Sequence, residues 1–244
     1  MPRALAIETS GRIGSIAIVQ DDRILAEEQF AHGLQHAAHI IPMIDRLCRE
    51  QHWTPRDIDH LYVSHGPGSF TGLRIGITLA KTMALATGVK IVPVPTVKVL
   101  AENAPEDANN LVIVLDAKRD QIFTARFSRD ASAPSSSTSG ASRSWREEEP
   151  AHLDSLTAML TRSPRPVHLL GEGIAYHRKF VPENDPSIIL TPEDSWRARA
   201  SAVAKLGSRL AQDNCFANPL TLTPIYIRRP EAEEKLLQRE AQRS

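Results

Sequence analysis

The residues best suited to chemistry lie in one glycine-rich run, Ser64-His65-Gly66-Pro67-Gly68-Ser69-Phe70-Thr71-Gly72-Leu73-Arg74-Ile75-Gly76. Glycine and proline favour a tight loop, and Ser69 or Thr71 could cap a helix whose first N–H groups point out of that loop. Such a loop can hold an anion, or it can let another stretch of backbone approach closely. The candidate contacts for an anion or a nucleotide in this run are Gly66, Gly68, Ser69, Thr71 and Arg74.

The glycine spacing alone leaves these two uses open. The run is not a P-loop, because Gly68 to Gly72 is too short and Leu-Arg follows where Lys-Ser or Lys-Thr is required. The dinucleotide-binding pattern Gly-x-Gly-x-x-Gly also fails, since Thr71 stands where the third glycine would be. A structural corner between a strand and a helix is the simpler interpretation.

Three histidines, His32, His36 and His39, have a spacing that could place two or three imidazoles on one helix face, as in many metal sites. Asp45 is the nearest carboxylate, and Gly33 marks a helix boundary that would separate His32 from the others. We therefore expect no metal site here. A serine hydrolase is not indicated either, because the Gly-x-Ser-x-Gly pattern is missing from the sequence.

The elements that must position these residues predict an α/β chain. Short apolar or alternating runs predict strands, and apolar stripes at helical spacing predict helices. We expect strands near residues 4–8, 14–19, 24–30, 61–63, 90–94, 111–116, 121–127, 167–170 and 187–190, and a short extended piece at 225–227. We expect helices near residues 36–51, from 55 onward for a short turn, 70–87, 96–103, 153–160 and 197–212.

The helix after the glycine-rich run carries a ridge of very small side chains at every fourth position, Gly72, Gly76, Ala80 and Ala84. Such a ridge lets a second helix or a sheet approach closely. The surrounding residues are mostly apolar, which predicts a helix that is buried on more than one side. The ridge could therefore pack on this chain's own sheet or form part of an interface with another protein.

The composition is that of an ordinary globular protein of 244 residues, with 41% apolar and 24% charged side chains and no net charge. A chain without net charge has no overall basic field that would attract nucleic acid. Cys48 and Cys215 lack the spacing of a metal site, so we expect thiols in a reducing compartment. The sequence shows no apolar run of signal-peptide or membrane-spanning length, and we expect a cytoplasmic protein that does not bind membranes.

We expect two lobes and a tail. Residues 1–104 form the first lobe, and residues 105–230 begin with a strand pair that weakly repeats the first and form the second. Within the second lobe, residues 128–146 are rich in serine and alanine without periodicity, which predicts a flexible surface insertion. Residues 231–244 predict a polar C-terminal helix or tail.

Several motifs, in this order, resemble those of one known family. They are Ala6-Ile7-Glu8-Thr9-Ser10, the Ile40-Ile41-Pro42 segment after His36, the glycine-rich run, Leu115-Asp116-Ala117-Lys118-Arg119 and Pro224-Ile225-Tyr226-Ile227-Arg228-Arg229. On these residues the chain resembles the TsaB (YeaZ) family of bacterial tRNA threonylcarbamoyladenosine biosynthesis proteins, within a wider group called glycoprotease or peptidase M22-like. The likeness is strongest over the first 127 residues.

The resemblance implies two actin-like (ASKHA, ribonuclease-H-like) lobes with mixed sheets flanked by helices. It implies a scaffold subunit without catalytic activity of its own, which binds the catalytic paralogue TsaD and works with the ATPase TsaE. ATP, a metal ion and threonylcarbamoyl-adenylate would then belong to the complex, and tRNA would be reached through it. The two helices around residues 40–48 and 73–84 would dock on TsaD, or on a second copy of this chain, through Ile40, Ile44, Leu47, Leu73, Gly76, Ala80, Met83 and Ala84.

The resemblance also bears on the candidate site. The turn at Glu8, Thr9 and Ser10 resembles the phosphate-binding start of actin-like ATPases, with Glu8 in the place of a metal-organising aspartate, although a plain hairpin would also fit. The metal histidines of TsaD match Thr96 and Leu100 here, and neither can act as a metal ligand in that role. The alternative function is that of a stand-alone actin-like enzyme, either a phosphotransferase or an M22-like peptidase.

Overall fold

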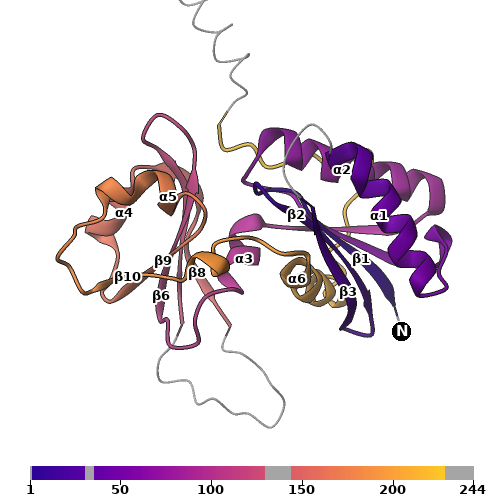
Figure 1. Ribbon diagram of the computed structural model, residues 1–244, viewed down its shortest axis with the longest axis horizontal. Coiled ribbons are helices and arrows are strands. Elements are labelled where there is room, and N and C mark those ends of the chain that lie inside the picture. Colours follow the sequence, from indigo (N-terminus) through magenta and orange to yellow (C-terminus); the bar gives the residue numbers. More distant parts are fainter. Residues whose placement is uncertain (1, 31–35, 130–143, 229–244) are drawn as a thin grey trace, which may run out of the picture.

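The computed structural model describes residues 2–30, 36–129 and 144–228, which form two lobes side by side (Figure 1). Each lobe has a five-stranded mixed sheet. Helices flank both sheets. The space between the lobes is occupied by helices from both the first and the second half of the sequence (Figure 1). This is the two-lobed α/β fold that the sequence predicted.

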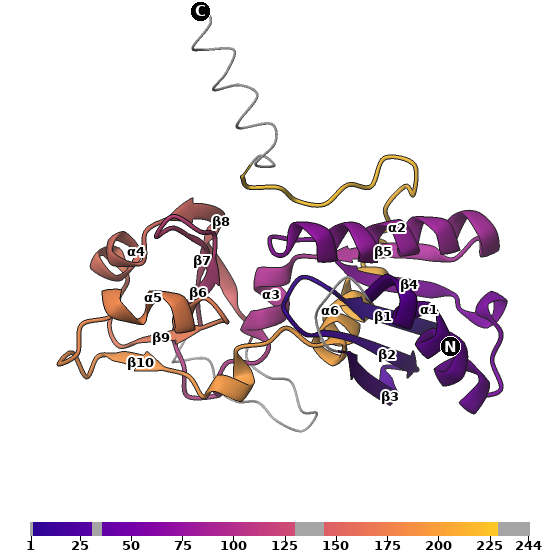
Figure 2. The same cartoon turned by 45° about the horizontal axis from the view of Figure 1, so that its top comes forward.

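Lobe 1 is built on two central strands that are buried on both faces, β1 (Arg3–Glu8) and β4 (His60–Ser64). The strand order is β3-β2-β1-β4-β5, in which β1, β4 and β5 (Lys90–Val94) are parallel and β2 (Gly14–Gln20) and β3 (Arg23–Phe30) are antiparallel. One face packs on α1 (His36–Glu50) and α2 (Phe70–Thr87), which lie side by side in Figures 1 and 2. Pro42 lies inside α1, and Gly88 ends α2 in a left-handed conformation with a φ of 81°.

Lobe 2 repeats the sheet plan with the strand order β10-β9-β6-β7-β8. Its strands are β6 (Asn110–Asp116), β7 (Ile122–Ser128), β8 (Arg146–Asp154), β9 (Val167–Leu170) and β10 (Ile188–Leu190). Its helices are α4 (Leu156–Arg162) and the short α5 (Ile174–His177). Short 3-10 turns occupy Pro55–Asp57 in lobe 1 and Arg178–Phe180 and Glu193–Ser195 in lobe 2.

The predicted boundary of lobe 2 at residues 105–230 is wrong, because α6 (Ala200–Gln212) returns to lobe 1. It covers the second face of the lobe 1 sheet together with α3 (Thr96–Ala101). A Cβ on Gly207 would lie only 2.3 Å from the Tyr62 ring, so the glycine lets α6 sit directly on β4. The apolar stripe of a helix does not specify which of two sheets the helix packs on, so the boundary could not be read from the sequence.

The predicted insertion at 128–146 and the predicted helix at 153–160 also need correction. Strand β8 begins at Arg146 and pairs antiparallel with β7, while the helix begins only at Leu156, after the cap Ser155. Residues 130–143 lie outside the described part of the chain, as does the predicted tail at 231–244. The segment Arg-Glu-Glu-Glu that opens β8 is highly charged, so it lacks the apolar alternation by which strands are recognised.

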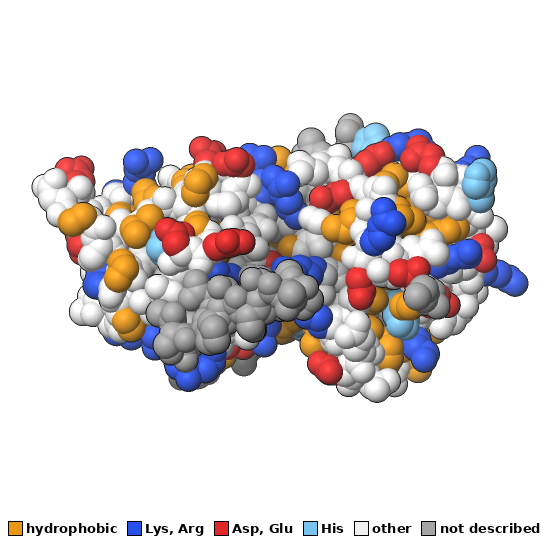
Figure 3. Space-filling model, turned by 90° about the horizontal axis from the view of Figure 1, so that it is seen from below, with side chains coloured by type: hydrophobic (Ala, Val, Ile, Leu, Met, Phe, Trp, Pro, Cys, Tyr) orange, Lys and Arg blue, Asp and Glu red, His pale blue; other side chains and the backbone are white. Residues whose placement is uncertain are grey.

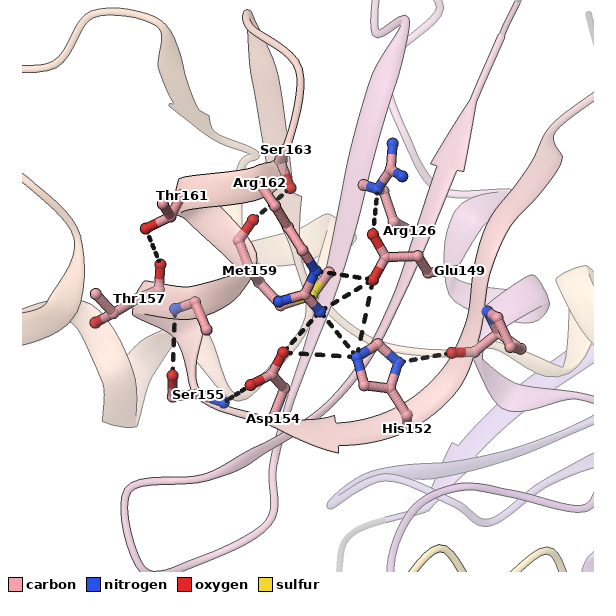
Figure 4. A network of polar contacts seen from close by, with 12 residues as sticks. Arg126, Glu149, His152, Asp154, Ser155, Thr157, Met159, Thr161, Arg162 and Ser163 are labelled. Atoms are coloured by element: carbon pink, nitrogen blue, oxygen red, sulfur yellow. Dashed lines mark hydrogen bonds and ion pairs between the residues drawn. The ribbon is translucent and has the colours of Figure 1, made fainter.

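A network of charges holds this edge strand against its neighbours (Figure 4). Arg162 of α4 donates to Glu149 at 2.9 Å and forms an ion pair with Asp154 at 2.6 Å. Arg126 of β7 donates to Glu149 at 2.9 Å, and His152 Nε2 lies 3.0 Å from Arg162 Nη2. The hydrogen bond from Arg162 lowers the pKa of Glu149, and it helps to lower that of Asp154 against the opposing effect of partial burial.

We expect Arg162→Met to reduce the free energy of unfolding by about 1 kcal/mol at neutral pH, the upper end for partly exposed ion pairs. Because both carboxyl pKa values are lowered in the folded protein, this stabilisation is present at neutral pH and disappears as the pH falls below the ordinary values of 4.5 and 3.8. Urea denaturation at about pH 7 and about pH 3 measures both effects. Arg146→Met is the matched control, because Arg146 lies at the start of β8 and its side chain pairs with Glu148 at 2.6 Å, outside the group formed by Arg162, Glu149 and Asp154. Equal losses at both pH values would contradict the assignment.

Candidate functional site

The glycine loop, residues 65–69, joins β4 to α2 and lies on the turn that follows β1. The Ser69 N–H donates to the Ser10 carbonyl at 2.7 Å, and Ser69 Oγ caps α2 by accepting from the Gly72 N–H at 3.2 Å. A Cβ on Gly68 would lie 2.5 Å from the Ser10 carbonyl oxygen. Of the two uses that the sequence left open, the structure displays the close approach of another stretch of backbone.

The ridge of small residues on α2 continues this contact. A Cβ on Gly72 would lie 1.9 Å from the Thr9 carbonyl oxygen, and one on Gly76 would lie 2.5 Å from Thr9 Oγ1. Farther along the helix, Ala80 and Ala84 are buried in the core of lobe 1. The ridge therefore packs on this chain's own first turn and sheet.

This packing corrects the residues predicted for a partner interface. Seven of the eight are buried in this chain, namely Ile40, Ile44, Leu47, Leu73, Gly76, Ala80 and Ala84, and Met83 packs against the same core. A partner cannot touch these side chains while the lobe stays folded. The outer stripe of α2 instead consists of Thr71, Arg74, Thr78, Thr82 and Leu85. Leu85 is 66% exposed, and Ile41 on the neighbouring α1 is 60% exposed.

The C-terminal strap, residues 217–228, brings a third motif to the glycine loop (Figure 2). Its Ile225 N–H donates to the His65 carbonyl at 2.7 Å, and a Cβ on Gly66 would lie 2.7 Å from the Ile225 carbonyl oxygen. Gly66 also has a φ of +117°, which side chains rarely adopt. The expected extended piece at 225–227 is not a strand: Ile225 pairs with the glycine loop through one hydrogen bond, and Ile227 lies in a bend.

Glu8 lies fully buried at the end of β1 beneath this arrangement. Its Oε1 accepts hydrogen bonds of 2.5 Å from both the N–H and the hydroxyl of Ser10. Within the described part of the chain, no hydrogen-bond partner is found for Glu8 Oε2 or for Thr9 Oγ1. Burial raises the pKa of Glu8 against the opposing effect of these hydrogen bonds. Of the predicted anion contacts, Ser10, Gly68 and Ser69 thus lie together near this buried carboxyl group, and the Ser10 N–H and hydroxyl already donate to it.

A cleft of about 410 Å³ opens between the lobes next to this turn. Lobe 1 lines it with Ser10, Arg12, Gly68 and Ser69, and lobe 2 lines it with Asp116, Lys118, Glu172 and Tyr176. Thr96 and Leu100, which we expected at the positions of the TsaD metal histidines, also line it. Thr71 and Arg74 are on the exposed side of α2, and Arg74 donates to Tyr226 of the strap at 3.2 Å.

Sequence reasoning missed the group around Asp116. Its carboxylate accepts from the Lys118 N–H at 3.0 Å and from Lys118 Nζ at 2.6 Å, and it lies 3.1 Å from Nε2 of the buried His177. Partial burial raises the pKa of Asp116, but these hydrogen bonds outweigh it and hold the pKa below its ordinary value. The motif containing Asp116 was recognised from the sequence, whereas nothing local marked His177 as its partner.

The predicted absence of a histidine metal site stays a prediction. His32 and the side chain of His36 lie outside the described part of the chain, and His39 is exposed on α1. Among the described residues, no group of three or more His, Cys, Asp or Glu side chains is arranged to hold a metal ion. In the same part of the chain, no helix is long and apolar enough to cross a membrane.

Glu8→Gln tests the buried carboxyl. A raised folded pKa means that the folded state binds the proton more tightly than the unfolded state, so wild-type stability falls as the pH rises above the ordinary value of 4.5. We expect the variant to lack this decline, so that its stability relative to wild type increases between about pH 5 and about pH 8. Thermal unfolding across that range is the measurement. A constant difference at every pH would show that the pKa is not raised.

Gly72→Ala tests the contact with Thr9. The added Cβ has no space beside the Thr9 carbonyl, so we expect a loss of about 1–3 kcal/mol in the free energy of unfolding. Gly88→Ala is the control, because nothing lies within 4 Å of its Cβ and only the left-handed backbone opposes it. Denaturant titration compares the two variants. Since glycine is a poor helix former, a wild-type or higher stability of Gly72→Ala would refute the close contact.

Comparison with known proteins agrees with these features. The family model described as "TsaD: tRNA N6-adenosine threonylcarbamoyltransferase" matches residues 31–235. The tRNA threonylcarbamoyladenosine biosynthesis protein TsaB of Bacillus subtilis is 28% identical over 236 residues, which cover 96% of this chain and 97% of the relative. The protein of the same name from Haemophilus influenzae is 26% identical over 97% of this chain and 98% of its own length.

The fold is also that of a solved relative. The structure of YeaZ from Pseudomonas aeruginosa matches 93% of this chain and 100% of its own with a TM-score of 0.74, at 20% sequence identity. This likeness confirms the predicted two-lobed fold class, and the family model covers more than half of the chain. By its motifs, its matched residues and its fold, the chain belongs to the TsaB (YeaZ) family.

Proposed function

We propose that this chain is a non-catalytic subunit in the biosynthesis of threonylcarbamoyladenosine in tRNA, where it binds and supports a TsaD-like catalytic paralogue. The names of its relatives supply the pathway. The non-catalytic role is inferred from the residues that line the interlobe cleft and the turn beside it. By the family resemblance, Thr96 and Leu100 take the positions of the paralogue's metal histidines, and both line this cleft. The carboxyl group of Glu8 is buried beneath the turn where an anion would bind.

The other components of the reaction are assigned to the complex in this proposal. ATP, the metal ion and threonylcarbamoyl-adenylate belong to the TsaD-like and TsaE-like subunits, and this chain has no cofactor of its own. When the TsaD-like partner is absent, two copies of this chain form a homodimer through the face that would bind the partner. The protein would act in the cytoplasm.

The outer faces of α1 and α2 are the surface that suits such a partner. The outer stripe of α2 contains three threonines, which are short enough to let another helix approach. The large exposed apolar side chains Leu85 and Ile41 lie on this helix pair. The lateral contact between α1 and α2 and their packing on the sheet bury the opposite faces, so these outer residues are available to another chain.

Thr82→Arg tests this docking face. An arginine there would block close helix approach, and we expect at least about tenfold weaker binding of the TsaD-like protein of the same organism, with an almost unchanged melting temperature. Thr161→Arg on α4 is a matched control, because both threonines are exposed and each donates to the carbonyl four residues earlier, at 2.9 and 2.8 Å. Binding is measured by titration calorimetry and folding by thermal unfolding.

Two results would overturn the proposal. Equal binding by the two arginine variants would remove the docking face. ATP hydrolysis or protein cleavage by the purified chain alone, abolished by Glu8→Ala, would establish the stand-alone enzyme in its place.

A further inference from the structure

Two of the three tyrosines in this chain are exposed, one at the interlobe cleft and one on the strap beside the glycine loop. Tyr176 on α5 is 48% exposed and Tyr226 on the strap is 38% exposed, whereas Tyr62 is 1% exposed in the core. Tyr176 also lines the cleft. Most aromatic side chains are placed to fill a core, so two exposed rings, one lining the cleft and one beside the glycine loop, suit a contact surface.

Basic side chains accompany both rings. On the lobe 1 side, Arg74 donates to Tyr226 Oη at 3.2 Å and lies 4.0 Å from the centre of the Phe70 ring. On the lobe 2 side, Lys118 Nζ lies 5.3 Å from the centre of the Tyr176 ring, and Arg12 donates to Tyr176 Oη.

The strap connects the two sides. Two residues after Tyr226, Arg228 donates to the Ala117 carbonyl oxygen and to Gln121 Oε1, next to Lys118. The strap thus connects two groups, Arg74 with Tyr226 on lobe 1 and Arg12 and Lys118 with Tyr176 at the cleft, which together we call the aromatic–basic surface.

The charge of this surface differs from that of the whole chain, whose net charge is zero. We count the charged residues of this surface, of the turn at 117–121 and in direct contact with either. The cations are Arg12, Arg74, Lys118, Arg119, Lys179 and Arg228, and the carboxylates are Asp116, Asp120 and Glu172. Positive charges are therefore in excess by three. The face seen from below in Figure 3 instead mixes both signs.

The turn that presents Lys118 is conformationally unusual. Lys118, Arg119 and Asp120 have φ values of 63°, 55° and 55°, all in the left-handed region. Each such residue with a Cβ costs roughly 1–2 kcal/mol, and conformations of this kind concentrate at functional sites. The Ala117 N–H donates to the Gln121 carbonyl at 2.9 Å and closes the turn, and the Lys118 side chain is 77% exposed.

We propose that the aromatic–basic surface binds single-stranded RNA. Tyr176 and Tyr226 stack on unpaired bases, while Arg12, Arg74 and Lys118 contact the phosphates. Single strands fit better than duplexes, because a ring can stack only on a base that is free of its neighbours. The inference rests on the proposed function only for the identity of the RNA, which would be an unpaired loop of the tRNA.

The test uses the full-length protein and a fluorescein-labelled single-stranded RNA of about 12 nucleotides, a length that spans one such binding surface. Fluorescence anisotropy measures the affinity, with a duplex of the same sequence as the comparison. We expect Tyr176→Ala to weaken binding at least about fivefold, since one stacked base contributes about 1–3 kcal/mol. Tyr176→Phe keeps the ring and removes only the acceptor for Arg12, so it should weaken binding clearly less than Tyr176→Ala.

Lys118→Ala should weaken binding and reduce the slope of log affinity against log salt by about 0.7, the value for one lost phosphate contact with a single strand. Arg56→Ala is the control, because Arg56 is exposed at the opposite end of the lobe 1 sheet, before β4 begins. We expect this control to bind like wild type.

The inference is overturned if Tyr176→Ala and Lys118→Ala bind the single strand as tightly as wild type. It is also overturned if the wild type and all variants bind the duplex as tightly as the single strand. Absence of binding at about 100 µM protein, the weak limit of non-specific nucleic-acid affinity, overturns it as well. These outcomes leave the proposed function intact when the same Tyr176→Ala protein still binds the TsaD-like partner. Loss of partner binding in Thr82→Arg has no bearing on the RNA measurement.

Discussion

The contact between the Thr9 carbonyl and α2 is the constraint on which the rest of lobe 1 depends. At Gly72 the helix backbone comes so close to this carbonyl that no Cβ would fit. The contact brings the N-terminus of α2 to the ends of β1 and β4. It also sets the glycine loop on the Ser10 carbonyl and leaves Glu8 without access to solvent. Any larger residue at Gly72 or Gly76 would lift the helix away from the sheet.

This constraint changes the character of the first turn. Short glycine-rich loops before a helix often bind anions through free N–H groups. Here the Ser69 N–H and the Ser10 N–H are both used within the chain, the first by a carbonyl and the second by the Glu8 carboxyl group. A turn that satisfies its own donors stabilises the fold, and it leaves less for a ligand. These two N–H groups of the turn therefore serve the packing of lobe 1.

The lobes are joined by more than the two chain crossings. Glu172 of lobe 2 accepts from the Arg12 N–H at 3.1 Å on one side of the cleft, and Arg228 of the strap reaches the β6–β7 turn on another. One continuous apolar core also runs from β1 and β4 through α3 and α6 to β6 and β7. A rotation of the lobes would disrupt all three, so the cleft and the outer face of α2 keep a fixed relation to each other.

Local pattern in the sequence determined most of the elements and the two-lobed α/β class, because strand and helix periods are properties of neighbouring residues. It narrowed the cap of α2 to Ser69 or Thr71, and the structure shows Ser69 in that position. The family followed from motifs that are contiguous in the chain. The tertiary structure alone decided which face of α2 is buried, because a ridge of small residues permits close packing but does not specify which segment packs against it. It alone placed α6 on lobe 1, made the charged segment at 146–154 an edge strand through Arg162, and joined Asp116 to His177 and Tyr176 to Arg12. Each of these depends on residues far apart in the chain, whose meeting is set by how the sheets pack and has no local signature.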